Sequence, residues 1–328
     1  MTISPSPSAP LVAVVGATGL QGGSLVAALA GSSKPYRVRG FTRDASKPAA
    51  EALKARGVEV VAANFVLGNE AAARSAFEGA DYAFLVTNFW EHFDLDREIA
   101  EGRLLIDAAR AAPSMRGIIW SGLLSPREVS NGKYTSMLHY EGKATITKYG
   151  LAVTAGTPVG FVVVPAAFYM ANFLATVDAL RMVRPVAGKP GEFRIEWDMK
   201  KDRKMELIDV EKDYGEFVVR RVIEPEVFPH GQEVNTRGEA LTPEEIAKAI
   251  SQGTGKNVVY NEITPEEWKR RLLEGGVPEL LAEDTIQTFA YFSEFGVYAH
   301  KSLASAEGIR LHTFAEFVQR SNWDEVFA

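Results

Sequence analysis

The chain has 328 residues, of which 46% are hydrophobic and 24% charged, a composition typical of a globular protein of about two domains. Its formal net charge of −6 disfavours direct binding of nucleic acid or of an anionic membrane surface. Cysteine is absent, which excludes disulfides, thiolate metal sites and thiol nucleophiles, and the five histidines form no spaced metal-binding set.

The first ten residues, MTISPSPSAP, are rich in Ser and Pro and lack the basic and apolar regions of a secretory signal. We therefore expect a disordered N-terminus over residues 1–10. No apolar run approaches the roughly 20 residues of a membrane-spanning helix. These features favour a cytoplasmic protein without a membrane partner, or a nuclear one if the protein is a regulator.

Short apolar segments alternate with helical patterns through the first half of the chain. The expected strands cover residues 11–15, 37–42, 58–63, 82–87, 117–121 and 161–164. The expected helices cover residues 22–29, 49–56, 70–77, 94–111 and 138–149. Strands that alternate with helices are typical of βαβ units. We therefore expect an α/β fold with a Rossmann-type, doubly wound parallel sheet over residues 11–165.

The pattern changes after about residue 165. Short strands are expected at 193–197 and 205–208, outside the main sheet. Two helices begin alike, with Thr-Pro-Glu-Glu at 242–245 and 264–267, where Thr can cap the helix and the second Glu can complete a capping box. Residues 166–328 are expected to form a smaller mixed α/β domain. This domain interleaves with the first if a strand near 233–236 returns to the main sheet.

A glycine-rich turn stands between the first expected strand and the first expected helix. In VVGATGLQGG, residues 14–23, Gly16, Gly19 and Gly22 are spaced three apart. One glycine allows the tight turn, one lets a pyrophosphate approach the backbone, and one lets the helix pack closely on the strand. The exposed amides at the helix start then bind the phosphates. This context favours a dinucleotide site over a plain turn.

The end of the second expected strand indicates which dinucleotide is bound. NAD sites commonly carry an acid there, about 20 residues beyond the loop. Here Thr42 and Arg43 take that place, and a guanidinium can bind a 2′-phosphate through forked hydrogen bonds. Asp44 follows one residue later and can instead pair with Arg43. We therefore expect NADP(H) as the cofactor.

Four segments together resemble the NmrA-like family of atypical short-chain dehydrogenases, above all its fungal members: GATGLQGG, VTNFW (86–90), VPAAFYMANF (164–173) and YFSEFGVYA (291–299). The resemblance covers about residues 11–320 and implies an NADP-binding domain, a small C-terminal domain and a cleft between them. By position it places Gly16, Thr18, Gly19, Leu20, Gln21 and Gly22 at the pyrophosphate, Arg43 at the 2′-phosphate, Asn64 and Phe65 at the adenine, Thr87 and Asn88 near the ribose and nicotinamide, Lys143 on the nicotinamide ribose, and Pro165 and Phe168 beside the nicotinamide.

The family resemblance implies two kinds of function. Some members resemble non-catalytic NADP sensors and transcriptional co-regulators, whereas isoflavone and phenylcoumaran ether reductases use NADPH chemically and keep a Lys without the usual Tyr. The expected partner is therefore either a small-molecule substrate or a regulatory protein. The charged run at 200–204 is interpreted as a solvated loop, with a nucleic-acid or partner surface as the alternative.

The segment LHYEGK, residues 138–143, departs from the Tyr-x-x-x-Lys pattern of short-chain dehydrogenases. Tyr140 stands three residues before Lys143, and the residue four before it is His139. One helical turn places His139 and Lys143 on the same face, and the ordinary pKa of an imidazole suits proton donation near neutral pH. Ser121, at the end of a strand, is expected to orient the substrate. The alternative proton donors are Tyr134 and a water held by Lys143 and Ser121.

Aromatic residues follow the fourth strand and recur later in the chain. Phe89, Trp90, Tyr169 and Phe295 can form the walls of a substrate pocket, although aromatic residues at such spacings also pack as core. The sequence thus predicts an NADPH-dependent reductase that transfers hydride to a small or medium-sized acceptor such as an aldehyde, ketone, enone or imine. The alternative is an NADP(H) redox sensor.

Overall fold

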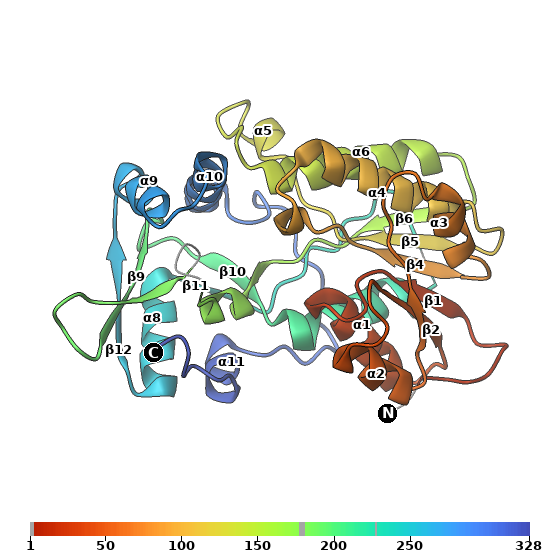
Figure 1. The fold of residues 1–328 in the computed structure, drawn as a ribbon, viewed down its shortest axis with the longest axis horizontal. Helices are drawn as coiled ribbons and strands as arrows, with labels where there is room; N and C mark the ends of the chain where they lie inside the picture. The colour runs from red at the N-terminus through yellow and green to blue at the C-terminus, as the bar shows by residue number, and fades with distance from the viewer. Residues whose placement is uncertain (1–2, 177–180, 227) are drawn as a thin grey trace.

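The six apolar segments of the first half form one parallel sheet in the order β3-β2-β1-β4-β5-β6 (Figure 1). The structure is a computed structural model that describes residues 3–176, 181–226 and 228–328. The strands of the sheet are β1 (Leu11–Val14), β2 (Arg37–Thr42), β3 (Glu59–Ala62), β4 (Tyr82–Leu85), β5 (Gly117–Trp120) and β6 (Gly160–Val163). This order confirms the predicted Rossmann-type sheet. The order in which successive strands are added reverses between β1 and β4, and sheets of this kind bind ligands at that point.

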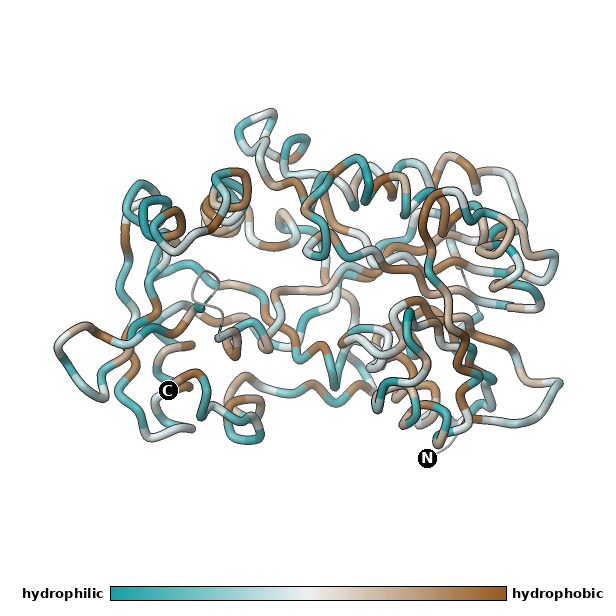
Figure 2. The backbone as a smooth tube through the Cα atoms, in the orientation of Figure 1, coloured by the Kyte–Doolittle hydropathy of each residue, from teal (hydrophilic) through white to brown (hydrophobic). Residues whose placement is uncertain are grey.

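Helices cover both faces of the sheet, as right-handed crossovers require. The helices of this half are α1 (Leu20–Gly31), α2 (Pro48–Ala55), α3 (Glu70–Ala76), α4 (Leu95–Arg110), α5 (Pro126–Val129) and α6 (Leu138–Thr154), with a 3₁₀ turn η1 (Phe89–Glu91) after β4. Figure 1 shows α1 and α2 on one face and α3, α4 and α6 on the other. Figure 2 shows hydrophobic stretches along the strands between them.

Alternate residues of β1 point to opposite faces and join two different cores. Leu11 and Ala13 belong to the cluster under α4, whereas Val12 and Val14 belong to a larger cluster that continues into the C-terminal half. All four side chains are buried, as expected of a strand covered on both faces.

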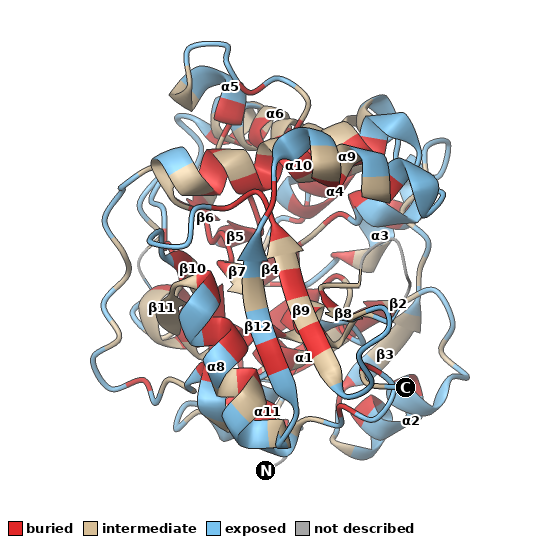
Figure 3. Cartoon of the chain, turned by 90° about the vertical axis from the view of Figure 1, so that its left-hand side faces the viewer, coloured by how far each residue is buried: buried red, intermediate tan, exposed pale blue. Residues whose placement is uncertain are grey.

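The C-terminal half forms two three-stranded sheets with helices around them. The strands are β7 (Phe168–Tyr169), β8 (Val183–Pro185), β9 (Glu192–Trp197), β10 (Met205–Ile208), β11 (Glu239–Leu241) and β12 (Asn257–Glu262), in the orders β11-β10-β7 and β12-β9-β8. The helices are η2 (Met170–Leu174), α7 (Gly215–Val218) between the π turns η3 (Val210–Tyr214) and η4 (Val219–Ile223), α8 (Pro243–Thr254), α9 (Pro265–Glu274), α10 (Glu279–Phe295) and α11 (Phe314–Arg320). Figure 3 shows buried and less buried residues alternating along β9.

The two similar helix starts differ in detail. At α8, Thr242 and Glu245 form the complete capping box. At α9, the Thr264 hydroxyl accepts from the amide of Glu267, but the Glu267 carboxylate pairs with Arg271. A cationic neighbour one turn along the helix therefore takes the carboxylate that the capping box would use.

The C-terminal half returns to the first sheet in two places. Residues 233–236, expected as a strand, form two isolated parallel bridges beside β6, between Val163 and Glu233 and between Ala166 and Thr236. The helical stretch around α7 packs on α1, where a Cβ at Gly215 would lie 2.2 Å from the Ser24 carbonyl oxygen.

The N-terminal segment differs from the disordered lead-in expected over residues 1–10. Residues 1 and 2 lie outside the described part, but Ile3 is 4% exposed and its amide donates to the Arg56 carbonyl. The amide of Ser4 donates to the Tyr36 carbonyl. The segment is held because Ile3 and Ala9 bury apolar surface against the edge of the domain.

Candidate functional site

The glycine-rich turn leads from β1 directly into the first turn of α1. Gly16 has a φ of +68°, which favours glycine, and a Cβ at Gly22 would lie 2.2 Å from the Gly16 carbonyl oxygen. Gly19 is the N-cap residue and offers no side-chain cap. Within the described residues, no acceptor is present for the amides of Leu20 and Gln21. This helix start therefore fits a phosphate group that approaches the backbone.

The side chains of the loop point in different directions. Thr18 and Leu20 are exposed. Gln21 is 7% exposed, and its Oε1 accepts from the Ser121 hydroxyl at 3.0 Å. Ser121, which follows β5, is itself buried. A hydrogen bond thus connects the residue after β5 with the start of α1. The Ser121 hydroxyl, which was expected to orient the substrate, donates to Gln21 instead.

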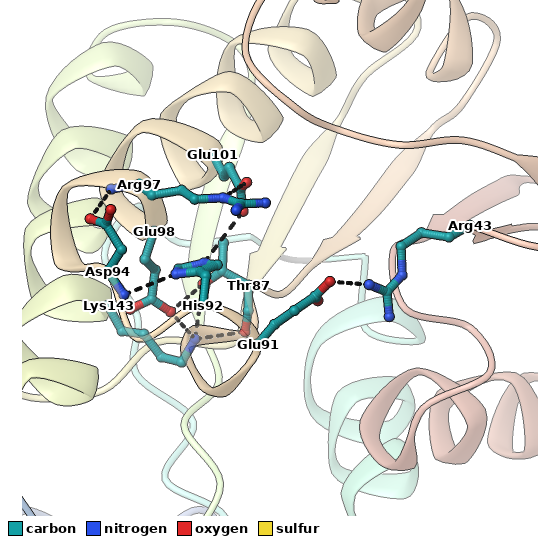
Figure 4. A network of polar contacts seen from close by, with 9 residues as sticks. All are labelled: Arg43, Thr87, Glu91, His92, Asp94, Arg97, Glu98, Glu101 and Lys143. Carbon is teal, nitrogen blue, oxygen red and sulfur yellow. Dashed lines mark hydrogen bonds and ion pairs between the residues drawn. The ribbon is translucent and has the colours of Figure 1, made fainter. Parts of the chain in front are cut away.

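Arg43 follows β2 and pairs with Glu91 of η1 rather than with Asp44 (Figure 4). Asp44, the alternative partner for Arg43, instead accepts from the amide and hydroxyl of Ser46. The Arg43 side chain is 67% exposed. Since an exposed ion pair contributes at most about 1 kcal/mol, a phosphate can displace Glu91 from the guanidinium.

Asn64 and Phe65, expected at the adenine, lie in the loop after β3. Asn64 is exposed. Phe65 is half-buried, with its ring centroid 5.2 Å from that of Phe41 and 5.7 Å from that of Phe77. The Phe65 ring therefore packs against the core, and only its solvent-facing side can contact a ligand.

Lys143 lies on α6 and makes a buried network with the end of β4 and the start of α4 (Figure 4). Its ammonium donates to the carbonyl and hydroxyl oxygens of Thr87, each at 2.9 Å, and to Glu98 Oε1 at 3.0 Å. The Thr87 hydroxyl in turn donates to Glu98 Oε1 at 2.8 Å. The three donors of Lys143 are thus all engaged, whereas the expectation assigned them to the nicotinamide ribose.

Glu98 is the member of this network that the sequence analysis missed. Its side chain is fully buried. A Cβ added at Gly142 would lie 2.4 Å from Glu98 Oε2. Glycine at this position of α6 therefore leaves the space that the carboxylate fills. Burial lowers the pKa of Lys143, and the charge of Glu98 opposes that shift. The signal available in the sequence was a glutamate on α4, the helix that packs against α6.

His139, one turn before Lys143, contacts the C-terminal half. Its Nδ1 lies 2.6 Å from Oδ1 of Asp284 on α10, with side-chain exposures of 13% and 1%. The indole of Trp90 lies against the imidazole, with ring centroids 4.9 Å apart. Tyr140 is buried beside Tyr291, and burial raises its pKa well above the ordinary value, which makes it a poor proton donor. Asp284 was not among the predicted residues.

The remaining aromatic candidates separate into exposed and packed residues. Trp90 is 45% exposed, whereas Phe89 is 1% exposed and packs in the core. Tyr134 is buried and its hydroxyl donates to Glu294 at 2.8 Å, so the second candidate donor is already engaged. Phe295 stacks on Tyr291 with centroids 5.3 Å apart.

Pro165, Phe168 and Tyr169 follow β6 and begin β7. Pro165 is buried, and its carbonyl accepts from the Thr236 hydroxyl at 2.9 Å. Phe168 is half-buried and meets the ring of Phe289 edge-on, with centroids 5.8 Å apart. Burial raises the pKa of Tyr169. Of the predicted residues, the structure brings Lys143 to Thr87 and His139 to Trp90, with exposed Asn88 between Thr87 and the aromatic turn.

A surface cavity of about 630 Å³ lies elsewhere, between α9, α10 and the turn after β9. It is lined by residues of the charged run, Lys200 and Arg203, together with Asp198 and Glu262, and Lys200 pairs with Glu262. Across the described ranges, no three His, Asp or Glu side chains gather so as to hold a metal ion. In the same part of the chain, no helix combines the length and apolar character that crossing a membrane requires.

A model of the NmrA-like family matches residues 8–323. The chain is 32% identical over 301 residues to the NmrA-like family domain-containing oxidoreductase cpsB of Aspergillus campestris, covering 89% of this chain and 84% of that protein. It is 26% identical over 312 residues to an NAD(P)H azoreductase of Xenophilus azovorans, with 94% and 97% covered. A crystal structure of NmrA, a negative transcriptional regulator, in complex with NADP has the same fold, with a TM-score of 0.72 at 21% identity over 95% of each chain. The chain therefore belongs to the NmrA-like family.

Proposed function

We propose that this protein is an NADPH-dependent reductase that acts on a small or medium-sized organic acceptor: an aldehyde, ketone, enone or imine. The observation that carries the proposal is the contact of Lys143 and His139, one turn apart on α6, with Thr87 and Trp90, which follow the carboxyl end of β4. A proton-bearing imidazole, a buried cation and an exposed aromatic surface meet where an α/β sheet binds its ligand.

The residues of this chain that would hold the cofactor are those of the loop and of the neighbouring strand ends. The amides at the start of α1 bind the pyrophosphate, and the exposed guanidinium of Arg43 binds the 2′-phosphate. When bound, the reduced dinucleotide supplies the hydride. Lys143 contributes a positive charge at this end of the sheet, and Thr87 and Glu98 hold its ammonium in place.

The proton is the part of the reaction that this chain supplies. Negative charge develops on the heteroatom of the acceptor as its carbon is reduced, and a nearby donor must neutralise it. His139 lies one helical turn from Lys143, against the partly exposed ring of Trp90. Tyr140 and Tyr134 are less suited, because the first is buried and the second donates to Glu294.

The relatives support this assignment at a coarser level. Both the Aspergillus protein and the Xenophilus protein carry names of redox enzymes, and the second acts on an azo compound by its name. The test is NADPH consumption, followed by its absorbance, across a panel of carbonyl, enone, imine, quinone and azo acceptors. Turnover of at least one acceptor, lost in Lys143→Ala, supports the reductase. No turnover with any acceptor refutes it.

The second candidate is a non-catalytic NADP(H) sensor that acts through a protein partner. One observation favours it: the ammonium of Lys143 is fully engaged by Thr87 and Glu98 and has no donor left for a ribose. The discriminating experiment is recovery of partners from cell extract on the immobilised protein, with and without NADPH. A specific partner that depends on the nucleotide, together with no turnover, favours the sensor.

A further inference from the structure

We propose that Asp284, on α10 of the C-terminal half, is a positioning residue that holds His139 in the orientation needed to deliver a proton. This inference rests on the proposed reductase function and names a residue that acts on the reaction through another. It follows from the contacts between α10 and the start of α6.

Both carboxylate oxygens of Asp284 bind the same residue of α6. Oδ1 lies 2.6 Å from the imidazole Nδ1 of His139, and Oδ2 accepts from its backbone amide at 3.3 Å. The Asp284 side chain is 1% exposed, so little water competes for these contacts. One carboxylate thus accepts from the backbone amide of His139 and also lies at ion-pair distance from its ring.

The position of His139 in its helix explains the second contact. His139 is the second residue of α6, where backbone amides have no partner within the helix, and the N-cap residue Met137 makes no side-chain cap. Asp284 therefore supplies a cap from another part of the chain. Its negative charge also suits the positive end of the α6 dipole.

The contact is part of a larger docking of α10. Gln287, one turn further along α10, accepts from the amides of Thr135 and Ser136 at 2.8 Å each. The Thr288 hydroxyl donates to the Asp284 carbonyl at 2.7 Å, which helps to hold this turn of α10. Gln287 contacts the loop just before α6 and not the imidazole of His139, and it therefore offers a matched control.

The chemistry requires one defined arrangement of the imidazole. Nδ1 lies at ion-pair distance from Asp284 without the alignment of a hydrogen bond, so the proposal requires the ring to turn until Nδ1–H is donated to Oδ1 and Nε2 carries the second proton. In the transfer, the Nε2–H bond breaks, its electron pair stays on Nε2 and the proton goes to the heteroatom of the acceptor. Neutral His139 keeps the Nδ1–H hydrogen bond and regains a proton from solvent. Asp284 thereby preserves one tautomer through the cycle.

The test compares Asp284→Ala with Gln287→Ala by NMR and kinetics. In the wild-type protein the imidazole Nδ1–H of His139 should give a slowly exchanging downfield resonance, assigned by its loss in His139→Gln. That resonance should be absent in Asp284→Ala and present in Gln287→Ala. If Asp284→Ala does not fold, Asp284→Val replaces it, because valine occupies the space without an acceptor. A resonance that survives the loss of the carboxylate overturns the proposal.

The kinetic arm separates positioning from a purely structural role. Asp284→Ala should lower kcat by about 10²-fold, the scale of a misplaced reacting group, with NADPH affinity unchanged. The double variant with His139→Gln should be no slower than His139→Gln alone, because the two residues act as a unit. Additive losses, or an equal loss in Gln287→Ala, overturn the proposal. If the wild-type protein reduces no acceptor, the proposed function fails, but the NMR comparison still decides whether Asp284 holds His139.

Discussion

Replacing Glu98 with Gln should destabilise the protein far more than the same change one turn away at Glu101. Glu98 is fully buried and pairs with Lys143 at 3.0 Å, whereas Glu101 is 17% exposed and pairs with Arg97 at 2.8 Å on the same helix. Breaking a buried pair leaves an uncompensated charge and costs about 3–5 kcal/mol. A partly exposed i, i+4 pair within one helix contributes about 0.3–0.5 kcal/mol. The predicted difference between the two variants is therefore several kcal/mol of unfolding free energy.

The dependence of this difference on pH identifies its cause. Burial lowers the pKa of Lys143 below the ordinary value of 10.5, and Glu98 opposes the shift. A Lys with a lowered pKa in the folded state binds fewer protons there than when unfolded, so stability rises with pH between the two values. Removing Glu98 lowers the pKa of Lys143 further, so the pH range over which stability rises begins at a lower pH. The cost of Glu98→Gln should therefore shrink as the pH rises from 7 towards 10.

The assay is urea unfolding of the wild type, Glu98→Gln and Glu101→Gln at a series of pH values. The double variant Glu98→Gln/Lys143→Met provides the control for charge, because it removes both partners of the pair. Its stability should exceed that of Glu98→Gln, since a buried apolar side chain carries no uncompensated charge. Equal losses for Glu98→Gln and Glu101→Gln, or a cost that does not change with pH, would refute the reasoning.

Three further predictions concern other parts of the chain. Arg43→Ala should weaken NADP binding by about 1–3 kcal/mol and leave NAD binding unchanged, as measured by calorimetry; tighter or equal binding of NAD by the wild type would remove the role given to Arg43. Gly22→Ala should abolish binding of either dinucleotide and lower the melting temperature, because its Cβ would lie 2.2 Å from the Gly16 carbonyl oxygen; normal affinity would contradict this packing. Burial raises the pKa of Asp198 from 3.8 to about 7, so folded protein binds the extra proton and stability falls as the pH rises through that window. Asp198→Asn should therefore match the wild type near pH 4 and exceed it by about 2–4 kcal/mol above pH 7 in urea unfolding; no gain at high pH would count against the shift.

The elements of the Rossmann half could be predicted because their signals are local. Apolar runs of four to six residues, the three spaced glycines and the alternation with helices lie within short windows of the chain. The paired Thr-Pro-Glu-Glu starts predicted α8 and α9 for the same reason. The sequence predicted least well those features that depend on what a segment packs against. The Ser and Pro content of residues 1–10 predicted disorder, but composition carries no information about the contacts that bury Ile3.

The charged partners of the candidate site could not be predicted, because each comes from a distant element. Arg43 pairs with Glu91, which is 48 residues away, and not with the adjacent Asp44. Glu98 reaches Lys143 across 45 residues. Spacing along one helix identifies residues that share a face, but it carries no information about which acid another helix brings to that face.

The change from Tyr-x-x-x-Lys to the arrangement in LHYEGK alters what the rest of the fold must provide. A tyrosine hydroxyl needs only a neighbouring cation to become more acidic, and Lys143 would be that cation in the usual pattern. An imidazole has two nitrogens and requires a partner that fixes which of them faces the substrate. Asp284 meets that requirement from α10, while Glu98 and Thr87 hold Lys143. On the proposed arrangement His139 takes its orientation from the C-terminal half, whereas the hydrogen bonds of Lys143 among the described residues come from the Rossmann half. Variants that loosen α10 should affect proton delivery without affecting the Lys143 network.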